Sequence, residues 1–422
     1  MDPSNPDSQS PRGLVQWWQA TPLYQRILGG MILGAVAGLF LGENAGPLAT
    51  PSKLVLRLLG ALAPALILVA IIHVLMNAKI EGRQAGRMVF LLILNTLVAI
   101  SIGLLVANVI GPGRWSKTPP QPERPQTQEA GKADVLEQFL DNIPRSLLGP
   151  LGDNGKVIGV IFLGIAFGVA FRRSARQPVT TLGDLVKIAL DALITVLHWI
   201  IDVVPFAVFG LVASIIGTQG FGAFQALGAF VVAVILALIL QGIYYLARIR
   251  VGSWVRPAPL LRGMRDALVM AFSTSSSTVT MPVTYECLRT RVGLREKSAS
   301  VGALVGANFN NDGTALYEAM SALFVSQMLA VHGLAAELDF TQQLMVVLTS
   351  VVASVGAAGI PEAGLVTMTL VFTAVGLPIE YIALLLPVDW FLDRCRTMIN
   401  VLGDVNVACL LDGRTREAAS TP

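Results

Sequence analysis

The chain has 422 residues, of which 54% are hydrophobic and only 14% are charged. Soluble domains average about 25% charged residues, so this composition is that of a protein that crosses a membrane several times. The formal net charge of +3 is too small to indicate a nucleic-acid partner, and the three cysteines lack the spacing of a zinc site or a disulfide framework.

The first part of the chain contains six apolar stretches that we predict to be membrane spans. They are residues 27–41 with their flanks, 54–76, 89–110, 157–171, 186–216 and 223–247. No short apolar run with a cleavage site precedes them, so we expect no cleaved signal peptide. A polar, proline-rich linker over residues 111–142 is expected to lack fixed structure.

Clusters of Lys and Arg indicate how the spans are oriented. They lie at residues 79–87, 172–176 and 248–265, and the positive-inside rule places them in the cytoplasm with both termini. The chain has no Asn-x-Ser/Thr sequon, which favours a prokaryotic source and therefore a cell (inner) membrane.

The second part of the chain alternates interrupted and continuous apolar segments. Residues 266–288 are broken by a Ser/Thr run, and residues 344–371 by a Gly/Pro run. Such breaks predict helical hairpins that enter the membrane and turn back, because irregular backbone at that depth must line a cavity. Full spans at 302–329 and 379–411 follow them, which is the repeat expected of a transporter with a midplane site. We predict an all-α membrane protein with eight spans and two re-entrant hairpins.

The last span carries a polar stripe. On a helix Asp389, Asp393, Arg396, Asn400 and Asp404 fall within about 80° of one another. Charges inside a membrane cost several kcal/mol each, so they face a cavity, a partner or a substrate. The stripe therefore predicts a site for cations together with an anionic group. The alternative is a set of ion pairs that lock helices together.

The span between the hairpins holds a second polar group. Asn310, Asp312 and Thr314 alternate, and Gly313 weakens helix propagation. We expect a local unwinding that frees oxygen ligands for a small hard cation, or alternatively a polar kink used only in packing. Glu318 lies one turn further on, where a carboxylate can carry a proton or simply accept hydrogen bonds.

Four motifs, in this order, resemble the dicarboxylate/amino acid:cation symporter family, the glutamate transporter homologues. They are TSSSTVTMPVT (274–284), NFNNDGTALYEA (308–319), GAAGIPEAGLVTM (356–368) and DWFLDRCRTMINVLGD (389–404). The resemblance implies a homotrimer, each protomer having a fixed scaffold and a transport domain that moves as an elevator. It assigns residues 1–88 to scaffold helices 1–2, 89–112 to transport helix 3, 113–222 to an extracellular linker and scaffold helices 4–5, and 223–422 to the transport domain.

The resemblance also implies a substrate site. Arg396 matches the position that grips the side-chain carboxylate of the substrate, and Asp393 the one that binds its ammonium group. Together they favour aspartate or glutamate over neutral amino acids or C4-dicarboxylates. Arg394 and Glu318 match the second arginine and the proton-carrying position of the animal excitatory amino acid transporters. The full set of substrate positions is Ser276, Ser277, Thr314, Gly359, Asp393, Arg396, Thr397 and Asn400.

Cation ligands follow from the same comparison. One sodium site matches Gly306, Asn310, Asn400 and Asp404, a second matches Asn95, Thr96, Asn310 and Asp312, and a third includes Ser354. The chain departs from the family pattern at Leu92, which replaces a tyrosine, at Asn311, which replaces a methionine, and at Glu362. Since Asn311 and Glu362 add hard oxygen ligands, H⁺ or Ca²⁺ is an alternative to the expected Na⁺.

Two other function classes compete with a symporter. An anion channel would use the arginines to line a pore, and the family resemblance allows conduction and transport in one protein. A membrane aspartyl protease would use Asp404, but it needs a second catalytic Asp motif and leaves the hairpins and Arg396 unexplained. We therefore expect a transporter, not an enzyme, whose partners are an acidic amino acid, inorganic cations, the lipid bilayer and two further copies of the chain.

Overall fold

The computed structural model describes residues 18, 21–77, 83–117, 147, 163, 166–167, 169–171, 179–220, 223–356 and 363–415. Within these ranges every regular element is a helix, which confirms the predicted all-α class. Several predictions fall outside the described residues: most of the fourth span, the linker beyond residue 117, the basic cluster at 172–176, and the tip of the second hairpin with Gly359 and Glu362.

Five of the described segments are long and apolar enough to cross a membrane, judged by length and composition. They are Leu23–Ala70, Gly86–Trp115, Leu182–Thr218, Phe224–Gly252 and Glu296–Val331. The last helix of the chain is not among them, because charged residues crowd its first half. The total of eight spans with two re-entrant hairpins therefore stays a prediction.

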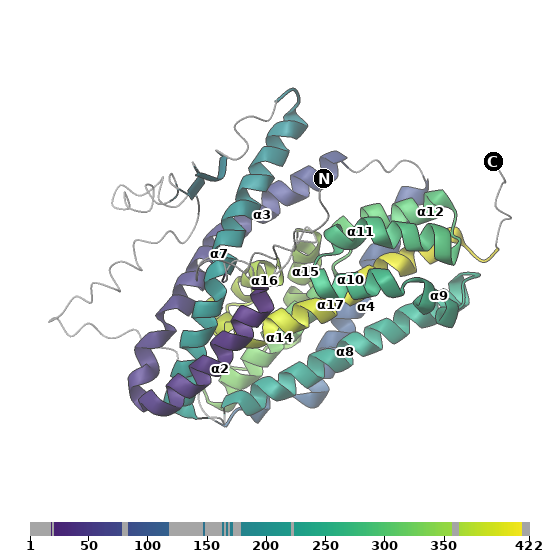
Figure 1. The fold of residues 1–422 in the computed structure, drawn as a ribbon. Coiled ribbons are helices and arrows are strands. Elements are labelled where there is room, and N and C mark those ends of the chain that lie inside the picture. Colours follow the sequence, from purple (N-terminus) through teal and green to yellow (C-terminus); the bar gives the residue numbers. More distant parts are fainter. Residues whose placement is uncertain are drawn as a thin grey trace, which may run out of the picture.

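Three long helices lie at one side of the molecule, and two of them, the first and second in chain order, pack against the third (Figure 1). They are α2 (Leu23–Leu41), α3 (Thr50–Asn77) and α7 (Leu182–Gln219), and the 3-10 turn η1 (Gly42–Ala49) joins α2 to α3 against α7. α2 exposes large apolar side chains such as Phe40, as expected of a surface that faces lipid.

A second group of helices surrounds α17 (Leu386–Asp412), which runs through the centre of the molecule in Figure 1. α4 (Arg83–Ile110), α8 (Ala223–Gly252) and α14 (Asp312–Val331) all contact α17. The 3-10 turn η2 (Pro112–Trp115) continues α4 and packs against α8 and α14. α14 and the second half of α17 are buried almost completely, so their polar residues face protein rather than lipid.

Between α8 and α14 the chain forms short helices. They are α9 (Pro257–Gly263), α10 (Arg265–Thr274), α11 (Ser277–Glu286), the π-helix η4 (Cys287–Val292), α12 (Glu296–Ser300), the π-helix η5 (Val301–Val305) and α13 (Gly306–Phe309). α10 and α11 pack together around a turn at Ser275, whose φ is 53°. Each has 10 residues and is about 15 Å long, half of the about 30 Å of a hydrocarbon core.

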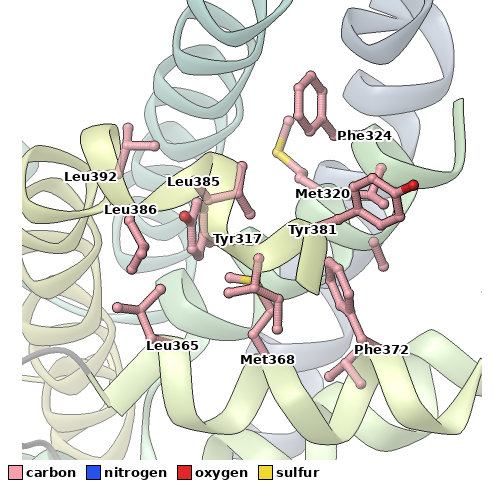
Figure 2. Close-up of a cluster of buried hydrophobic side chains, with 14 of the residues drawn as sticks. Tyr317, Met320, Phe324, Leu365, Met368, Phe372, Tyr381, Leu385, Leu386 and Leu392 are labelled. Atoms are coloured by element: carbon pink, nitrogen blue, oxygen red, sulfur yellow. The ribbon is translucent and has the colours of Figure 1, made fainter. Parts of the chain in front are cut away.

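A second pair of helices, α15 (Phe340–Gly356) and α16 (Ala363–Ala374), also packs together. The 3-10 helix η6 (Ile379–Leu385) then leads into α17. Figure 2 shows the apolar cluster that holds α16 in place: Leu365, Met368 and Phe372 of α16 lie beside Tyr317 of α14 and Tyr381 of η6. α16 is thereby fixed next to the polar face of α17.

The predicted span 302–329 is not one continuous helix, because it covers η5, α13 and α14. α13 ends at Phe309 and α14 begins at Asp312, so the expected unwinding lies at Asn310–Asn311. Gly313, which we expected to weaken the helix, is instead part of α14. Its role is close approach to α17, because a Cβ atom at Gly313 would lie 2.7 Å from the carbonyl oxygen of Arg396.

Candidate substrate and cation site

Arg396 is completely buried at the centre of α17. Its Nη1 donates to Asp389 Oδ1 at 2.8 Å, and its Nη2 donates to Asp393 Oδ1 at 2.7 Å. The guanidinium carbon lies 4.0 Å from the centre of the Tyr317 ring, a cation–π contact with α14. Both carboxylates belong to α17 itself, so these ion pairs do not lock two helices together, which was the alternative interpretation of the polar stripe.

The start of α16, in the predicted second hairpin, lies directly on this guanidinium. A Cβ atom at Gly364, near the start of α16, would lie 3.2 Å from Nη2 and 3.3 Å from Cζ of Arg396. Among the described residues, Arg396 Nε has no hydrogen-bond partner although it is buried. A buried donor without a partner costs about 1–3 kcal/mol, and such a cost is expected where a ligand supplies the missing acceptor.

The first hairpin presents its turn at the start of α11. Ser276 caps this helix by accepting the N–H of Val279 at 3.2 Å, and Ser277 Oγ donates to the carbonyl of Ala307 at 3.1 Å. The second bond ties the turn to α13, immediately before the break in the seventh predicted span. Both serines are buried, at a helix N-terminus that attracts carboxylates.

Asn400 links α17 to the first turn of α14. Its Oδ1 accepts the N–H of Gly313 at 2.8 Å, and its Nδ2 lies 3.4 Å from both Thr314 Oγ1 and Asn311 Oδ1. One turn earlier, Thr397 Oγ1 donates to the carbonyl of Asp393 at 2.8 Å. Thr314, Asp393, Arg396, Thr397 and Asn400 are therefore brought together on facing sides of α14 and α17.

Asn311 joins the same region to the second hairpin. Its Nδ2 donates to the carbonyl of Ser354 in α15 at 2.9 Å, while Ser354 Oγ bonds within α15, to the carbonyl of Val351 at 2.9 Å. The amide that replaces the family's methionine thus connects the unwound segment to α15.

A first candidate cation site lies where the chain unwinds. Asn310 Nδ2 donates to the carbonyl of Asn400 at 2.9 Å and to Asp404 Oδ1 at 3.0 Å. Gly306 lies against the Asp404 carboxylate, with no room for a side chain between them. Asn310 Oδ1 is buried without a partner among the described residues. A carboxylate, a carbonyl and an unused amide oxygen in one buried place suit a small hard cation.

The second predicted cation site is differently arranged. Both oxygens of Asp312 accept hydroxyl hydrogen bonds, one from Thr96 at 2.6 Å and one from Tyr245. Asn95 Oδ1 accepts a hydrogen bond from Arg248 Nη1. Tyr245 and Arg248 lie on α8. The sequence analysis did not identify them as site residues, because a tyrosine and an arginine near the end of an apolar span are typical of a membrane interface.

Glu318 is fully buried one turn beyond Thr314. Its Oε1 accepts a hydrogen bond from Thr367 of α16, and its Oε2 has no partner among the described residues. Glu318 therefore connects α14 to the second hairpin. This position allows either a proton-carrying or a hydrogen-bonding role.

Arg394 points away from Arg396. Its Nη1 donates to the carbonyls of Phe272 and Ser273 at 2.8 and 2.7 Å, and its guanidinium lies 5.0 Å from the ring of Tyr24 on α2. Cations near a helix C-terminus satisfy its last carbonyls. Arg394 therefore stabilises the end of α10, in the first hairpin.

Carboxylates are sparse at both candidate cation sites. Within the described part of the chain, no three His, Cys, Asp or Glu side chains are grouped as a metal cluster. Amide, hydroxyl and carbonyl oxygens would supply most ligands beside Asp404 or Asp312. Gly359 and Glu362, the two remaining predicted site residues, lie outside the described residues.

Comparison with known proteins confirms the resemblance that the four motifs indicated. A model of the sodium:dicarboxylate symporter family matches residues 23–414. An excitatory amino acid transporter of Caenorhabditis elegans is 29% identical over 477 residues, covering 97% of this chain and 92% of that protein. Human excitatory amino acid transporter 2 is 31% identical, with 89% and 76% covered. Excitatory amino acid transporter 1 of Ambystoma tigrinum is 29% identical, with 84% and 75% covered.

Proposed function

Because the chain belongs to the sodium:dicarboxylate symporter family, we propose that it is a secondary active transporter that takes up acidic L-amino acids, aspartate or glutamate, together with cations. The similar proteins are named excitatory amino acid transporters, which supports transport rather than catalysis. The apolar helices support a location in a membrane.

The observation that carries this proposal is the buried guanidinium of Arg396. An arginine fork binds both oxygens of a carboxylate at once, and Nε still lacks an acceptor among the described residues. Placing such a group in a membrane protein is costly. That cost is expected where the group binds an anionic substrate, and Gly364 of α16 places no side chain of its own against the guanidinium.

Substrate binding would exchange one set of ion pairs for another. Without substrate, the carboxylates of Asp389 and Asp393 both pair with the Arg396 guanidinium. A side-chain carboxylate that binds the guanidinium releases Asp393, which is then available to the substrate's ammonium group. Arg396 and Asp393 then each keep a partner of opposite charge, which matters because an unpaired buried charge costs about 3–5 kcal/mol. A dicarboxylate offers no ammonium group to Asp393, so the pair favours an acidic amino acid.

The remaining groups of the substrate have donors nearby. The α-carboxylate suits the N-terminus of α11 with Ser276 and Ser277, whose N–H groups and hydroxyls donate hydrogen bonds. Thr314, Asn400 and Thr397 line the facing helices, and Gly359 belongs to the tip of the second hairpin by resemblance alone.

Cation coupling is supported by shared residues. The first candidate cation site, Gly306, Asn310, Asn400 and Asp404, uses the carbonyl of Asn400, whose side chain bonds α14 at the substrate site. A cation there would supply the positive charge that Asp404 lacks. Because one residue serves both places, a cation that orders Asn400 also orders the substrate site. We propose Na⁺ as this ion, with H⁺, carried by Glu318, or Ca²⁺ as the alternatives.

We also propose a movement of the transport domain, on the basis of the family resemblance. α2, α3 and α7 would form a fixed scaffold in a homotrimer, and α4 with the residues from 223 onward would slide as an elevator. α10–α11 and α15–α16 would be re-entrant hairpins, since each helix of the first pair is too short to span a bilayer. The basic clusters support cytoplasmic termini. The similar proteins named above come from animals, so they lend no support to a prokaryotic source.

Uptake into proteoliposomes tests the proposed function. Purified protein is reconstituted and given labelled L-aspartate under an imposed Na⁺, H⁺ or Ca²⁺ gradient in turn. We expect saturable, stereospecific uptake against a concentration gradient under at least one of them. Neutral amino acids and C4-dicarboxylates serve as competitors, and current without saturable uptake would instead identify an anion channel.

Arg396→Ala sharpens this test. It should abolish binding of aspartate and glutamate while leaving neutral amino acids possible. Arg250→Ala, which removes an exposed arginine of α8, is the matched control and should leave binding unchanged. Unchanged aspartate affinity in Arg396→Ala would contradict the role assigned to the guanidinium.

A further inference from the structure

The two candidate cation sites differ in how their oxygens are used. At the first site, Asn310 Oδ1 is buried without a partner among the described residues. At the second site, the amide oxygen of Asn95 accepts a hydrogen bond from Arg248, and each carboxylate oxygen of Asp312 accepts one from a hydroxyl group. The amide oxygen of Asn310, which both predicted sites share, is therefore unused, whereas the oxygens of Asn95 and Asp312, which only the second site contains, are occupied by donors of this chain.

Arg248 also supplies charge. Its guanidinium stacks against the ring of Tyr244 at 5.3 Å, which fixes its direction on α8, and it lies near enough to Asp312 to interact electrostatically with the carboxylate. Asn95 is held by two further hydrogen bonds. Gln241 Nε2 donates to the backbone carbonyl of Asn95 at 3.5 Å, and Asn95 Nδ2 donates to Asn406 Oδ1 at 3.5 Å. The face of α4 that was predicted to bind a metal cation therefore contacts a guanidinium group instead.

We propose that Arg248 takes the place of a bound metal cation at the second site, so that Asn95, Thr96 and Asp312 do not bind a transported ion in this protein. A metal ion there would meet a positive charge on one of its own ligands, and like charges at contact distance repel strongly in a medium of low dielectric constant. The residues do not fit a metal cation, and the family's second site is filled by a side chain.

Counting charges gives the consequence. Each of the two candidate cation sites contains one carboxylate, Asp404 at the first and Asp312 at the second. The guanidinium of Arg248 permanently balances the charge of Asp312. Of these two sites, only the one at Asp404 is then left to bind an exchangeable cation together with the substrate. This inference rests on the proposed function for its meaning in transport, but the occupancy of the second site can be measured without any amino acid.

The variant Arg248→Met removes the charge and keeps an apolar side chain of similar length. We expect it to create a cation site: Na⁺ added without amino acid should raise the thermal midpoint of purified Arg248→Met protein more steeply than that of the unchanged protein. Arg248→Lys, which keeps the charge, should behave like the unchanged protein. Arg250→Met removes an exposed arginine of the same helix and controls for net charge.

Aspartate binding provides a second measurement. In Arg248→Met, the slope of log Kd against log [Na⁺] should become steeper by about one, so that each tenfold dilution of Na⁺ weakens aspartate binding by about a further tenfold. Equal slopes and equal Na⁺ stabilisation in Arg248→Met and the unchanged protein would overturn the inference.

The variant Asn95→Ala keeps the proposal testable if Arg248→Met fails to fold. If Asn95 does not bind a transported ion, Asn95→Ala should leave the Na⁺ slope of the otherwise unchanged protein as it was. A slope reduced by about one would show that Asn95 is an ion ligand, and the inference would be wrong. Failure of the unchanged protein to bind aspartate or glutamate under any ionic condition would instead contradict the proposed function, leaving the Na⁺ titration without amino acid to decide the inference.

Discussion

Replacing Gly364 by alanine tests whether the second hairpin closes directly onto Arg396. The added Cβ atom would lie 3.2 Å from Nη2 and 3.3 Å from Cζ of Arg396, which is closer than most such contacts. The guanidinium cannot easily move, because two ion pairs of 2.8 and 2.7 Å and the ring of Tyr317 hold it. We expect α16 to move outward and make room when no substrate is bound.

We expect the second hairpin, α15–α16, to close when substrate binds, so the cost of the extra methyl group should fall on binding. Overpacking a well-packed region costs about 1–3 kcal/mol, which corresponds to a loss of aspartate affinity of about 5- to 150-fold. Fold stability should change little, because alanine is favoured over glycine within a helix by up to about 1 kcal/mol.

Titration calorimetry with L-aspartate at saturating cation measures this loss. Gly60→Ala is the matched control: it also adds a methyl group to a helix, but the nearest atom would be Ile379 Cδ1 at 3.7 Å, an ordinary contact. We expect Gly60→Ala to bind as the unchanged protein does. If Gly364→Ala also kept full affinity, the hairpin would not close on the guanidinium and our account of the site would be wrong.

Three further changes test other parts of the structure. Glu318→Gln keeps an acceptor for Thr367 but cannot carry a proton, so uptake should lose its dependence on an imposed pH gradient while aspartate binding remains; a persisting dependence would exclude Glu318 as the carrier. Asp393→Asn removes the charge for the substrate ammonium, so competition by L-aspartate should weaken relative to that by succinate, and an unchanged ratio in competition assays would contradict the assignment. The Arg114 guanidinium beside Glu337 holds the pKa of that carboxylate below its usual range, so the pair should stabilise the fold at neutral pH and lose this effect as acidification passes through the lowered pKa. Because both side chains are nearly half exposed, Arg114→Gln should lower the free energy of unfolding by less than about 1 kcal/mol. Its thermal midpoint should differ from that of the unchanged protein more at neutral than at acidic pH, and equal differences would refute the linkage.

Local sequence patterns were enough to predict the helical class, the interrupted helices and the polar face of α17. Apolar periodicity and length mark spans, and the cost of placing charges in a membrane makes a stripe such as Asp389, Asp393 and Arg396 conspicuous. The break at Asn310–Asn311 was also predicted, but from Gly313, which lies within α14. The consecutive amides account for it better, because they favour hydrogen bonds with side chains and neighbouring backbone over a regular helix.

Which atoms meet was decided only by packing. Arg396 could have formed ion pairs with another helix, but its carboxylate partners belong to its own helix. Its contacts with other helices are the ring of Tyr317 on α14 and Gly364 on α16. Arg248 lies far along the chain from Asn95, and no local pattern relates the end of α8 to the middle of α4. Such contacts depend on the direction of each side chain after the helices have packed, whereas periodicity along one helix records only which face is polar.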